Sequence, residues 1–174
     1  FKEKLKAENF DAVVHCISYT EKHAEDVVSI FNGTSVHLIV LSSGDSYDAF
    51  QGLNRKIDKA ELPITEDSPL SSIKYYWKDF DTKGVLAEKY DKNLMTNILM
   101  RANREVGLKV TVFRLSMIYG PGDHQYPGRH GPIIRRIIDK RSDLVLSDIG
   151  QCQVYTYGYI ENVADAIVHS LGMN

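Results

Sequence analysis

The sequence predicts an α/β fold in which helices cover both faces of a parallel sheet, in three layers. Three runs of mainly apolar residues, 12–17, 35–41 and 109–115, are too continuous for strands with one solvated face. Helical patterns separate these runs, and helices between strands are typical of parallel sheets. The chain has 174 residues and a net charge of −2. We therefore expect one globular unit, with no electrostatic attraction to nucleic acid.

The first two predicted strands flank a helix. Residues 12–17 form a β-branched run that indicates a buried strand. Residues 21–31 place apolar side chains at helical spacing and end at Asn32 and Gly33, a typical helix terminator. The run at 35–41 is the second strand, and we expect it to be buried on both faces.

A polar stretch, from about residue 42 to 81, separates the second strand from the next helix. Its aromatic cluster at 75–77 is a candidate lid or interface anchor. A long helical pattern runs from about 82 to 106 and stops at Gly107. The third strand, 109–115, follows directly and is also predicted to be buried.

The last third of the chain predicts shorter elements. Helices are expected at about 132–140 and 162–171, with strands near Leu144 and Val154. We find no internal repeat and no linker that would separate two folding units.

Composition and cysteine usage favour the cytoplasm. The longest apolar stretch, Val36 to Leu41, is far too short to span a bilayer. Cys16 and Cys152 both lie in apolar runs, which is typical of buried thiols in a reducing compartment. No cluster of His and Cys has the spacing of metal ligands, so no metal is expected.

Four motifs occur in a fixed order along the chain. They are V-H-C-I-S at 14–18, L-S-S-G-D-S-Y at 41–47, R-L-S-M-I-Y-G-P-G-D at 114–123 and Y-I-E-N-V-A-D-A at 159–166. Together they resemble the extended short-chain dehydrogenase/reductase superfamily, in its NAD-dependent epimerase/dehydratase branch. The resemblance implies a Rossmann-type, doubly wound parallel sheet and either NAD or NADP as cofactor. In such sheets, ligands bind beyond the carboxyl ends of the strands.

The superfamily's glycine-rich fingerprint, G-x-x-G-x-x-G on its first strand, does not occur in these 174 residues. By comparison with the family, residues 10–12 correspond to the start of the fourth strand. The resemblance therefore implies a partial NAD(P)-binding domain without its first strands, with the beginning of the substrate-binding region from about residue 120.

The family's catalytic set is a Ser or Thr followed by Tyr-x-x-x-Lys on a helix. The usual spacing to Tyr47 implies Ser43 as the hydroxyl, although a Ser at a strand end also bonds to the backbone there. Two lysines are candidates. Lys92 matches the family's spacing to Arg114 without a gap, whereas Lys83 would need one. Lys92 is the better match.

The position four before Lys92 holds Glu88, where the family has Tyr. Glu88 could be an acid/base itself, or could pair with Lys92 across one helical turn. Tyr90 is the other candidate proton carrier, but on a regular helix it points to another face, so it could substitute only if the helix is distorted. Asp45 falls where dehydratase members carry a catalytic acid, although Asp is also common in such turns.

The resemblance also implies which residues bind the cofactor. Lys92 would hold the nicotinamide ribose. The residues that would line the nicotinamide lie at the ends of the first and third strands: Cys16, Ile17, Ser18, Leu115, Ser116, Met117 and Ile118.

Two departures from the family concern the substrate. Met117 and Tyr155 stand where sugar-nucleotide members carry an Asn and an Arg that contact the substrate's phosphates. Charge-assisted bonds carry the recognition of a diphosphate, so these exchanges argue against a standard sugar nucleotide.

The sequence therefore predicts an NAD(P)-dependent epimerase, dehydratase or reductase acting on a small hydroxyl or carbonyl substrate. The alternative is a non-catalytic dinucleotide-binding sensor or regulatory protein on the same fold. The expected partner is a small molecule, with neither nucleic acid nor membrane, and a homodimer is a candidate assembly.

Overall fold

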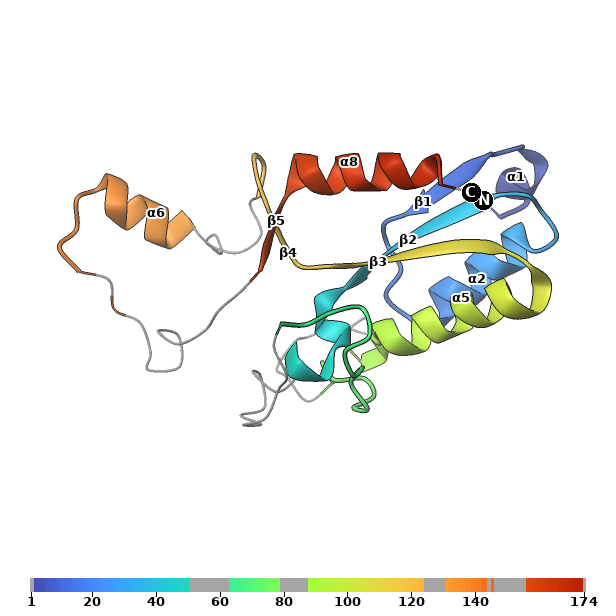
Figure 1. The fold of residues 1–174 in the computed structure, drawn as a ribbon, viewed down its shortest axis with the longest axis horizontal. Helices are drawn as coiled ribbons and strands as arrows, with labels where there is room; N and C mark the ends of the chain where they lie inside the picture. Colours follow the sequence, from blue (N-terminus) through green and yellow to red (C-terminus); the bar gives the residue numbers. More distant parts are fainter. Residues whose placement is uncertain are drawn as a thin grey trace. The chain divides into compact units, whose positions relative to one another are not determined.

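The computed structural model describes residues 2–50, 63–78, 88–123, 131–143, 145 and 156–173. Figure 1 shows the elements along the chain. The chain divides into two compact units: the first comprises Phe1–Leu115 with Ile167–Asn174, and the second comprises Ser116–Ala166.

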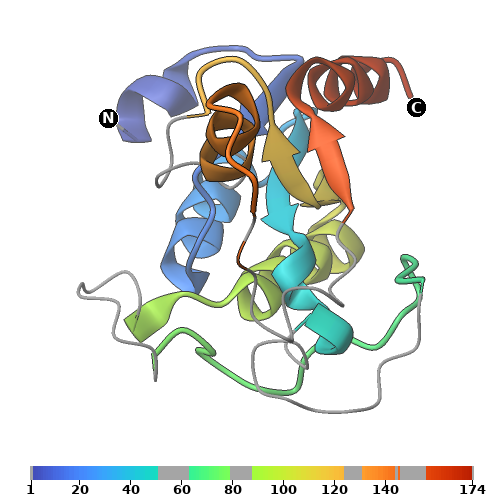
Figure 2. The same cartoon turned by 90° about the vertical axis from the view of Figure 1, so that its left-hand side faces the viewer.

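A parallel sheet of three strands forms the centre of the first unit. In spatial order its strands are β1 (Ala12–His15), β2 (His37–Ser43) and β3 (Lys109–Leu115). β2 pairs with both neighbours, and both pairings are parallel. The predicted α/β fold with a parallel sheet is therefore confirmed. Figure 2 shows β2, in cyan, running into the turn that follows it.

The three strands differ in burial. Leu38, Ile39 and Val40 of β2 are 0% exposed, as the continuous apolar run predicts. Val14 of β1 is 40% exposed, and every residue of β3 is only half-buried. The prediction that the first and third strands are fully buried is therefore wrong. Within the described residues both strands lie at an edge of the sheet, a property that an apolar run cannot reveal.

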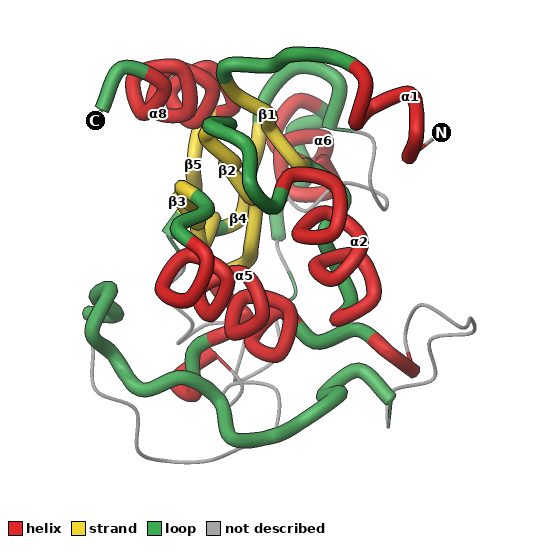
Figure 3. The backbone as a smooth tube through the Cα atoms, turned by 90° about the vertical axis from the view of Figure 1, so that its right-hand side faces the viewer, coloured by secondary structure: helices red, strands yellow, loops and turns green. Residues whose placement is uncertain are grey.

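Two helices cover one face of this sheet. α2 (Glu21–Phe31) has the predicted bounds and is capped by the hydroxyl of Thr20, which accepts a hydrogen bond from the backbone N–H of His23. α5 (Lys92–Val106) ends at Gly107, whose φ of 71° is the left-handed conformation that glycine adopts at helix ends. Figure 3 shows the two helices side by side against the sheet.

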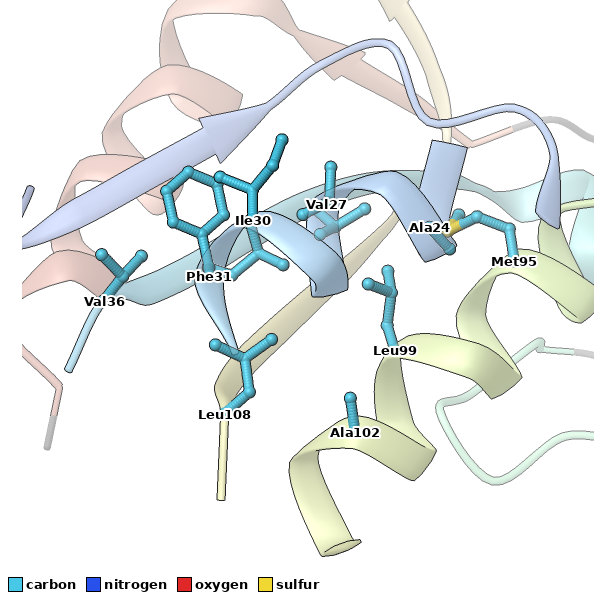
Figure 4. Close-up of a cluster of buried hydrophobic side chains, with 11 residues drawn as sticks. Ala24, Val27, Ile30, Phe31, Val36, Met95, Leu99, Ala102 and Leu108 are labelled. Atoms are coloured by element: carbon cyan, nitrogen blue, oxygen red, sulfur yellow. The ribbon is translucent and has the colours of Figure 1, made fainter. Parts of the chain in front are cut away.

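The hydrophobic core lies between α2, α5 and the sheet, as Figure 4 shows. Its buried members are Ala24, Val27, Ile30, Phe31, Val36, Leu38, Val40, Met95, Leu99, Ala102 and Leu108. The apolar faces that the sequence predicts for the helices α2 and α5 therefore pack against the sheet. Burial of this apolar area is the main stabilising term for the first unit.

The start of α5 differs from the prediction of one helix from about residue 82. The backbone of Asp91 is extended, with φ −155° and ψ 103°, and α5 begins only at Lys92. The Asp91 carboxylate accepts hydrogen bonds from the backbone N–H groups of Asn93, at 3.0 Å, and Leu94, at 2.9 Å. This N-cap starts a new helix where the spacing of apolar residues predicts a continuous one.

Smaller elements complete the description. α1 (Lys2–Ala7) places Leu5 against the core, and the 3-10 turn η1 (Gly44–Ser46) follows β2. In the second unit, β4 (Met117–Tyr119) pairs in parallel with β5 (Tyr157–Tyr159). This unit also holds α6 (Gly131–Ile138) and most of α8 (Ile160–Leu171). The strands predicted near Leu144 and Val154 fall outside the described residues.

One prediction about burial is corrected. Cys16 is exposed rather than buried, because it follows the last residue of the edge strand β1, where the chain leaves the sheet. Cys152 lies outside the described residues. Tyr76, from the predicted lid or anchor, is 1% exposed and thus packs inside the first unit. Among the described helices, none has the length and apolar character needed to cross a bilayer.

Candidate functional site

Three chain segments converge at one edge of the sheet in the first unit. They are the segment after β1 with Ser18 and Tyr19, the turn after β2 with Ser43 and Asp45, and the segment that leads into α5. The carboxyl ends of parallel strands lie at the same edge, which is where ligands bind in open sheets of this kind.

The Lys92 side chain links the segment after β1 to the end of β2. Its side chain is buried, and Nζ donates hydrogen bonds to the carbonyl oxygens of Ser18 and Leu41, the latter at 3.1 Å. Burial lowers the pKa of Lys92 to about 8, and the negative charge of Asp45 opposes that shift. The ammonium is thus held at the strand ends by backbone dipoles.

Two aromatic rings lie beside the same ammonium. Nζ of Lys92 is 4.5 Å from the ring centroid of Tyr19 and 5.8 Å from that of Tyr90. The two rings stack on each other, with centroids 5.8 Å apart. Cation–π attraction partly replaces the water that burial removes from Lys92.

Tyr90 contributes a buried phenolic hydroxyl to this group. Its hydroxyl donates to Oδ2 of Asp45 at 3.1 Å, and its ring meets the edge of Tyr76, with centroids 5.6 Å apart. Burial raises the pKa of Tyr90, and the charge of Asp45 raises it further; the hydroxyls of Tyr76 and Ser43 act in the opposite direction. The phenol is therefore held in its protonated form.

Hydrogen bonds of the α5 N-terminus position these side chains. The backbone N–H of Asp91 donates to the carbonyl of Tyr19 at 3.0 Å, and its Oδ2 accepts from the N–H of Tyr75 at 3.0 Å. Nδ2 of Asn93 donates to the carbonyls of Ser46, at 2.9 Å, and Ser71, at 3.2 Å. The segments that carry Tyr19, Asp45 and Tyr76 are thus tied to one helix end.

Ser43 lies within this group but already has a structural role. Its hydroxyl oxygen accepts a hydrogen bond from the backbone N–H of Asp45 at 3.4 Å and so caps η1. The same hydroxyl interacts with the Tyr90 hydroxyl and lowers the pKa of Tyr90. In the sheet, Ser43 pairs with Leu115 of β3. The structural and functional interpretations of Ser43 are therefore compatible.

Glu88 is placed differently from the other candidates. It is exposed, and no ion pair joins it to Lys92 in the described part of the chain. Because the extended Asp91 separates the two residues, they do not share one face of a continuous helix. The same break places Tyr90 beside Lys92, which is the distortion that a role for Tyr90 requires.

The residues expected to line a nicotinamide fall in both units. Ser18 is 1% exposed and Ile17 is 63% exposed; both follow β1, as does Cys16. Leu115 ends β3, in the first unit. Ser116 to Ile118 belong to the second unit, where Met117 and Ile118 are paired with β5.

The alternative lysine Lys83 and the substrate-side position Tyr155 fall outside the described residues. The structure adds Tyr19 and Tyr76 to the group, which the sequence analysis missed. Tyr19 directly follows the V-H-C-I-S motif, and this adjacency could have identified it. Tyr76 lies in a long loop, with no spacing that connects it to Tyr90. No cluster of metal-binding side chains occurs among residues that the structure describes.

The donors and acceptors near Lys92 fit a polar ligand such as a ribose. An ammonium has three N–H donors, and two of them serve the carbonyls of Ser18 and Leu41. The Ser18 hydroxyl and Nδ1 of His15 are buried and have no hydrogen-bond partner within the described ranges. Buried polar atoms usually have partners, so these atoms are available to a bound molecule.

Comparison with solved structures shows the fold. UDP-glucuronic acid 4-epimerase from Bacillus cereus, a mutant in complex with a fluorinated UDP-glucuronic acid and NAD, matches with a TM-score of 0.65 and 14% identity over 98% of this chain and 51% of that one. UDP-N-acetylglucosamine 4-epimerase from the same organism matches at 0.63 and 15%, over 98% of this chain and 57% of that one.

A short-chain dehydrogenase/reductase superfamily protein from Agrobacterium tumefaciens with bound NAD matches with a TM-score of 0.64 and 13% identity, over 98% of this chain and 59% of that one. The chain thus spans between about half and three fifths of the length of these proteins.

A search of curated protein sequences found no match. The sequence model of the NAD dependent epimerase/dehydratase family matches residues 86–174, just over half of the chain. The protein therefore belongs to the NAD-dependent epimerase/dehydratase family.

Proposed function

We propose that the protein is an NAD(P)-dependent epimerase, dehydratase or reductase that acts on a small hydroxyl or carbonyl substrate. Membership of the family supports the reaction class. The observation that carries the proposal is the buried Lys92, held at the strand ends beside the Tyr90 phenol. A cation and a hydroxyl in such proximity suit a site that binds a nicotinamide ribose and moves a proton.

Lys92 would hold the ribose of NAD or NADP with its third N–H donor. Its other two donors fix Nζ in place, so little side-chain entropy is lost when the ligand binds. Ser18 would contribute its buried hydroxyl from the end of β1. Cys16, Ile17 and Leu115, all in the first unit, would line the nicotinamide. When bound, the cofactor would accept or donate a hydride.

Ser43 and Tyr90 would act on the substrate oxygen. Ser43 would orient it by a hydrogen bond, and Tyr90 would carry the proton that the oxygen gains or loses. The Ser43 hydroxyl interacts with the Tyr90 hydroxyl and lowers its pKa, which supports a shared role for the two residues. Glu88 is the alternative proton carrier, supported only by its place four residues before Lys92.

The proposed substrate is smaller than the sugar nucleotides named for two of the structural neighbours. Met117 supplies no amide donor, and Tyr155 supplies no cation, where sugar-nucleotide members of the family bind a diphosphate. Losing charge-assisted bonds weakens phosphate recognition more than it weakens recognition of a neutral hydroxyl or carbonyl group.

A second candidate is a dinucleotide-binding sensor that catalyses no reaction. The absence of Tyr from the position four before Lys92 favours it, because the usual proton carrier is then missing. Both candidates require binding of NAD(P), and only the first requires turnover.

Calorimetric titration of the full-length protein with NAD and with NADP tests the dinucleotide binding that both candidate functions require. Lys92→Met should weaken binding about 10-fold or more, since it removes a buried donor. The matched control is Lys89→Met, because Lys89 is exposed and lies three residues away. Lys83→Met tests the alternative lysine. Absence of binding by the wild type, or loss of binding only in Lys83→Met, would contradict the assignment.

A panel of alcohols and carbonyl compounds, assayed through the absorbance of the reduced nicotinamide, then separates the two candidates. Turnover of any member supports the enzyme. Bound NAD(P) without turnover across the panel favours the sensor.

A further inference from the structure

We propose that Asp45 and Tyr90 form a proton relay, in which Asp45 positions the Tyr90 hydroxyl and takes up its proton while Tyr90 receives the proton of the substrate hydroxyl. The relay deepens the proposed function and rests on it. Within this relay Asp45 is a positioning residue, because it acts on the substrate only through Tyr90.

The geometry of the pair supports the relay. The Tyr90 hydroxyl donates to Oδ2 of Asp45 at 3.1 Å, and Asp45 is 6% exposed. The Tyr90 ring is held by stacking on Tyr19, at 5.8 Å, and by the edge of Tyr76, at 5.6 Å. A hydroxyl fixed in this way keeps its lone pairs in one direction, as a proton carrier requires.

The pair lies within reach of the Lys92 charge. The ammonium of Lys92 and the carboxylate of Asp45 attract each other, although Nζ donates to the carbonyls of Ser18 and Leu41. Among the residues that the structure describes, the titratable groups that act on the relay are Lys92 and Tyr76. His15, on which Lys92 and His23 act, lies one step further away.

Burial and the Asp45 carboxylate raise the pKa of Tyr90, so the phenol does not ionise before the reaction. It must pass on its own proton as it accepts another.

The oxidative step then balances. A bound oxidised nicotinamide would supply the hydride acceptor, and the substrate alcohol would become a carbonyl as its carbon gives up the hydride. The hydroxyl proton of the substrate moves to the Tyr90 oxygen, and the phenolic proton moves to Oδ2 of Asp45. Reduction runs in reverse, with a protonated Asp45 returning the proton through Tyr90.

The contact is tested without the reaction by replacing Tyr90 with a fluorotyrosine, whose phenol is more acidic and whose ionisation is visible by fluorine NMR. In the presence of Asp45→Asn, the titration of this group should move to lower pH by about one unit or more, because the carboxylate no longer opposes ionisation. Asp48→Asn is the matched control, since Asp48 is an exposed carboxylate three residues away. An unchanged titration in Asp45→Asn overturns the relay.

The proton transfer is tested by kinetics in the full-length protein. Asp45→Asn should lower kcat about 100-fold or more with little change in KM, and should remove the acidic limb of the pH profile for substrate oxidation. Asp45→Glu, which keeps a carboxylate, should restore part of the activity. Wild-type kcat and an unchanged acidic limb in Asp45→Asn would overturn the relay alone. A wild type that turns over no substrate would overturn the enzymatic function, and the relay with it.

Discussion

At the scale of single residues, Lys92 shows how burial and charge are balanced. A lysine that is 3% exposed has lost nearly all of its water, and two carbonyl oxygens and two aromatic rings replace it only in part. Desolvation exceeds the attraction of Asp45, so the pKa falls from 10.5 to about 8. Near neutral pH the side chain is therefore charged, at a cost to the stability of the fold.

This cost predicts a pH dependence of stability. Between about pH 8 and 10.5, the unfolded chain keeps the proton on Lys92 while the folded chain loses it. Stability should therefore rise with pH over this window, relative to a variant without the amine. Denaturant unfolding of the wild type and of Lys92→Met, measured from pH 7 to pH 10, checks it. Lys89→Met serves as control, and parallel curves for wild type and Lys92→Met would contradict the prediction.

At the scale of elements, the N-terminus of α5 decides the layout of the site. The Asp91 carboxylate accepts three backbone hydrogen bonds, from Asn93, Leu94 and Tyr75. The cap both starts the helix and fixes the loop that carries Tyr76. A continuous helix would have directed Tyr90 to a different face from Lys92, whereas the extended Asp91 lets both reach the strand ends.

Loss of this cap should be costly. We expect Asp91→Ala to lower the free energy of unfolding by about 2 kcal/mol, because it removes an N-cap and leaves buried N–H groups without acceptors. Chemical denaturation measures the change. Glu105→Ala, at the exposed end of the same helix, removes only a surface pairing with Arg101 at 4.0 Å and should change little. Equal effects of the two variants would contradict the role of the cap.

At the scale of the whole molecule, the candidate site depends on one core. The residues that carry it belong to the first unit, whose core joins α2 and α5 to the sheet. The single tryptophan, Trp77, belongs to the first unit, so its fluorescence reports the unfolding of that unit.

A cavity in the core should therefore be visible to Trp77. Leu99 is 0% exposed in α5, and Leu99→Ala should lower the free energy of unfolding by about 2 to 5 kcal/mol. Tryptophan fluorescence during denaturation measures the loss. Ile134 is 52% exposed in α6 of the second unit. Its replacement by Ala should leave the midpoint of the denaturation curve reported by Trp77 unchanged. A similar shift in both variants would mean that the two units unfold together.

Part of the site could be predicted from the sequence. Motif spacing singled out Ser43 and Lys92, and the structure brings both to the edge where Tyr90 lies. The contact of Asp45 with Tyr90 joins residues 45 positions apart and depends on the break at Asp91. The residues around position 90 do not specify that contact, because their apolar spacing is equally compatible with one continuous helix from about residue 82.

The parallel α/β class, the bounds of α2 and β3, the end of α5 and the family could all be predicted from the amino-acid sequence. These features follow from apolar periodicity, from turn residues and from motifs, all of which are properties of neighbouring residues. Three features emerge only in the folded chain: β1 and β3 are less buried than β2, Cys16 is exposed, and Tyr19, Tyr76 and Tyr90 gather around Lys92 and Asp45. Burial and side-chain contacts depend on which segments the sheet register and the helix caps bring together, and that is a property of the folded chain as a whole.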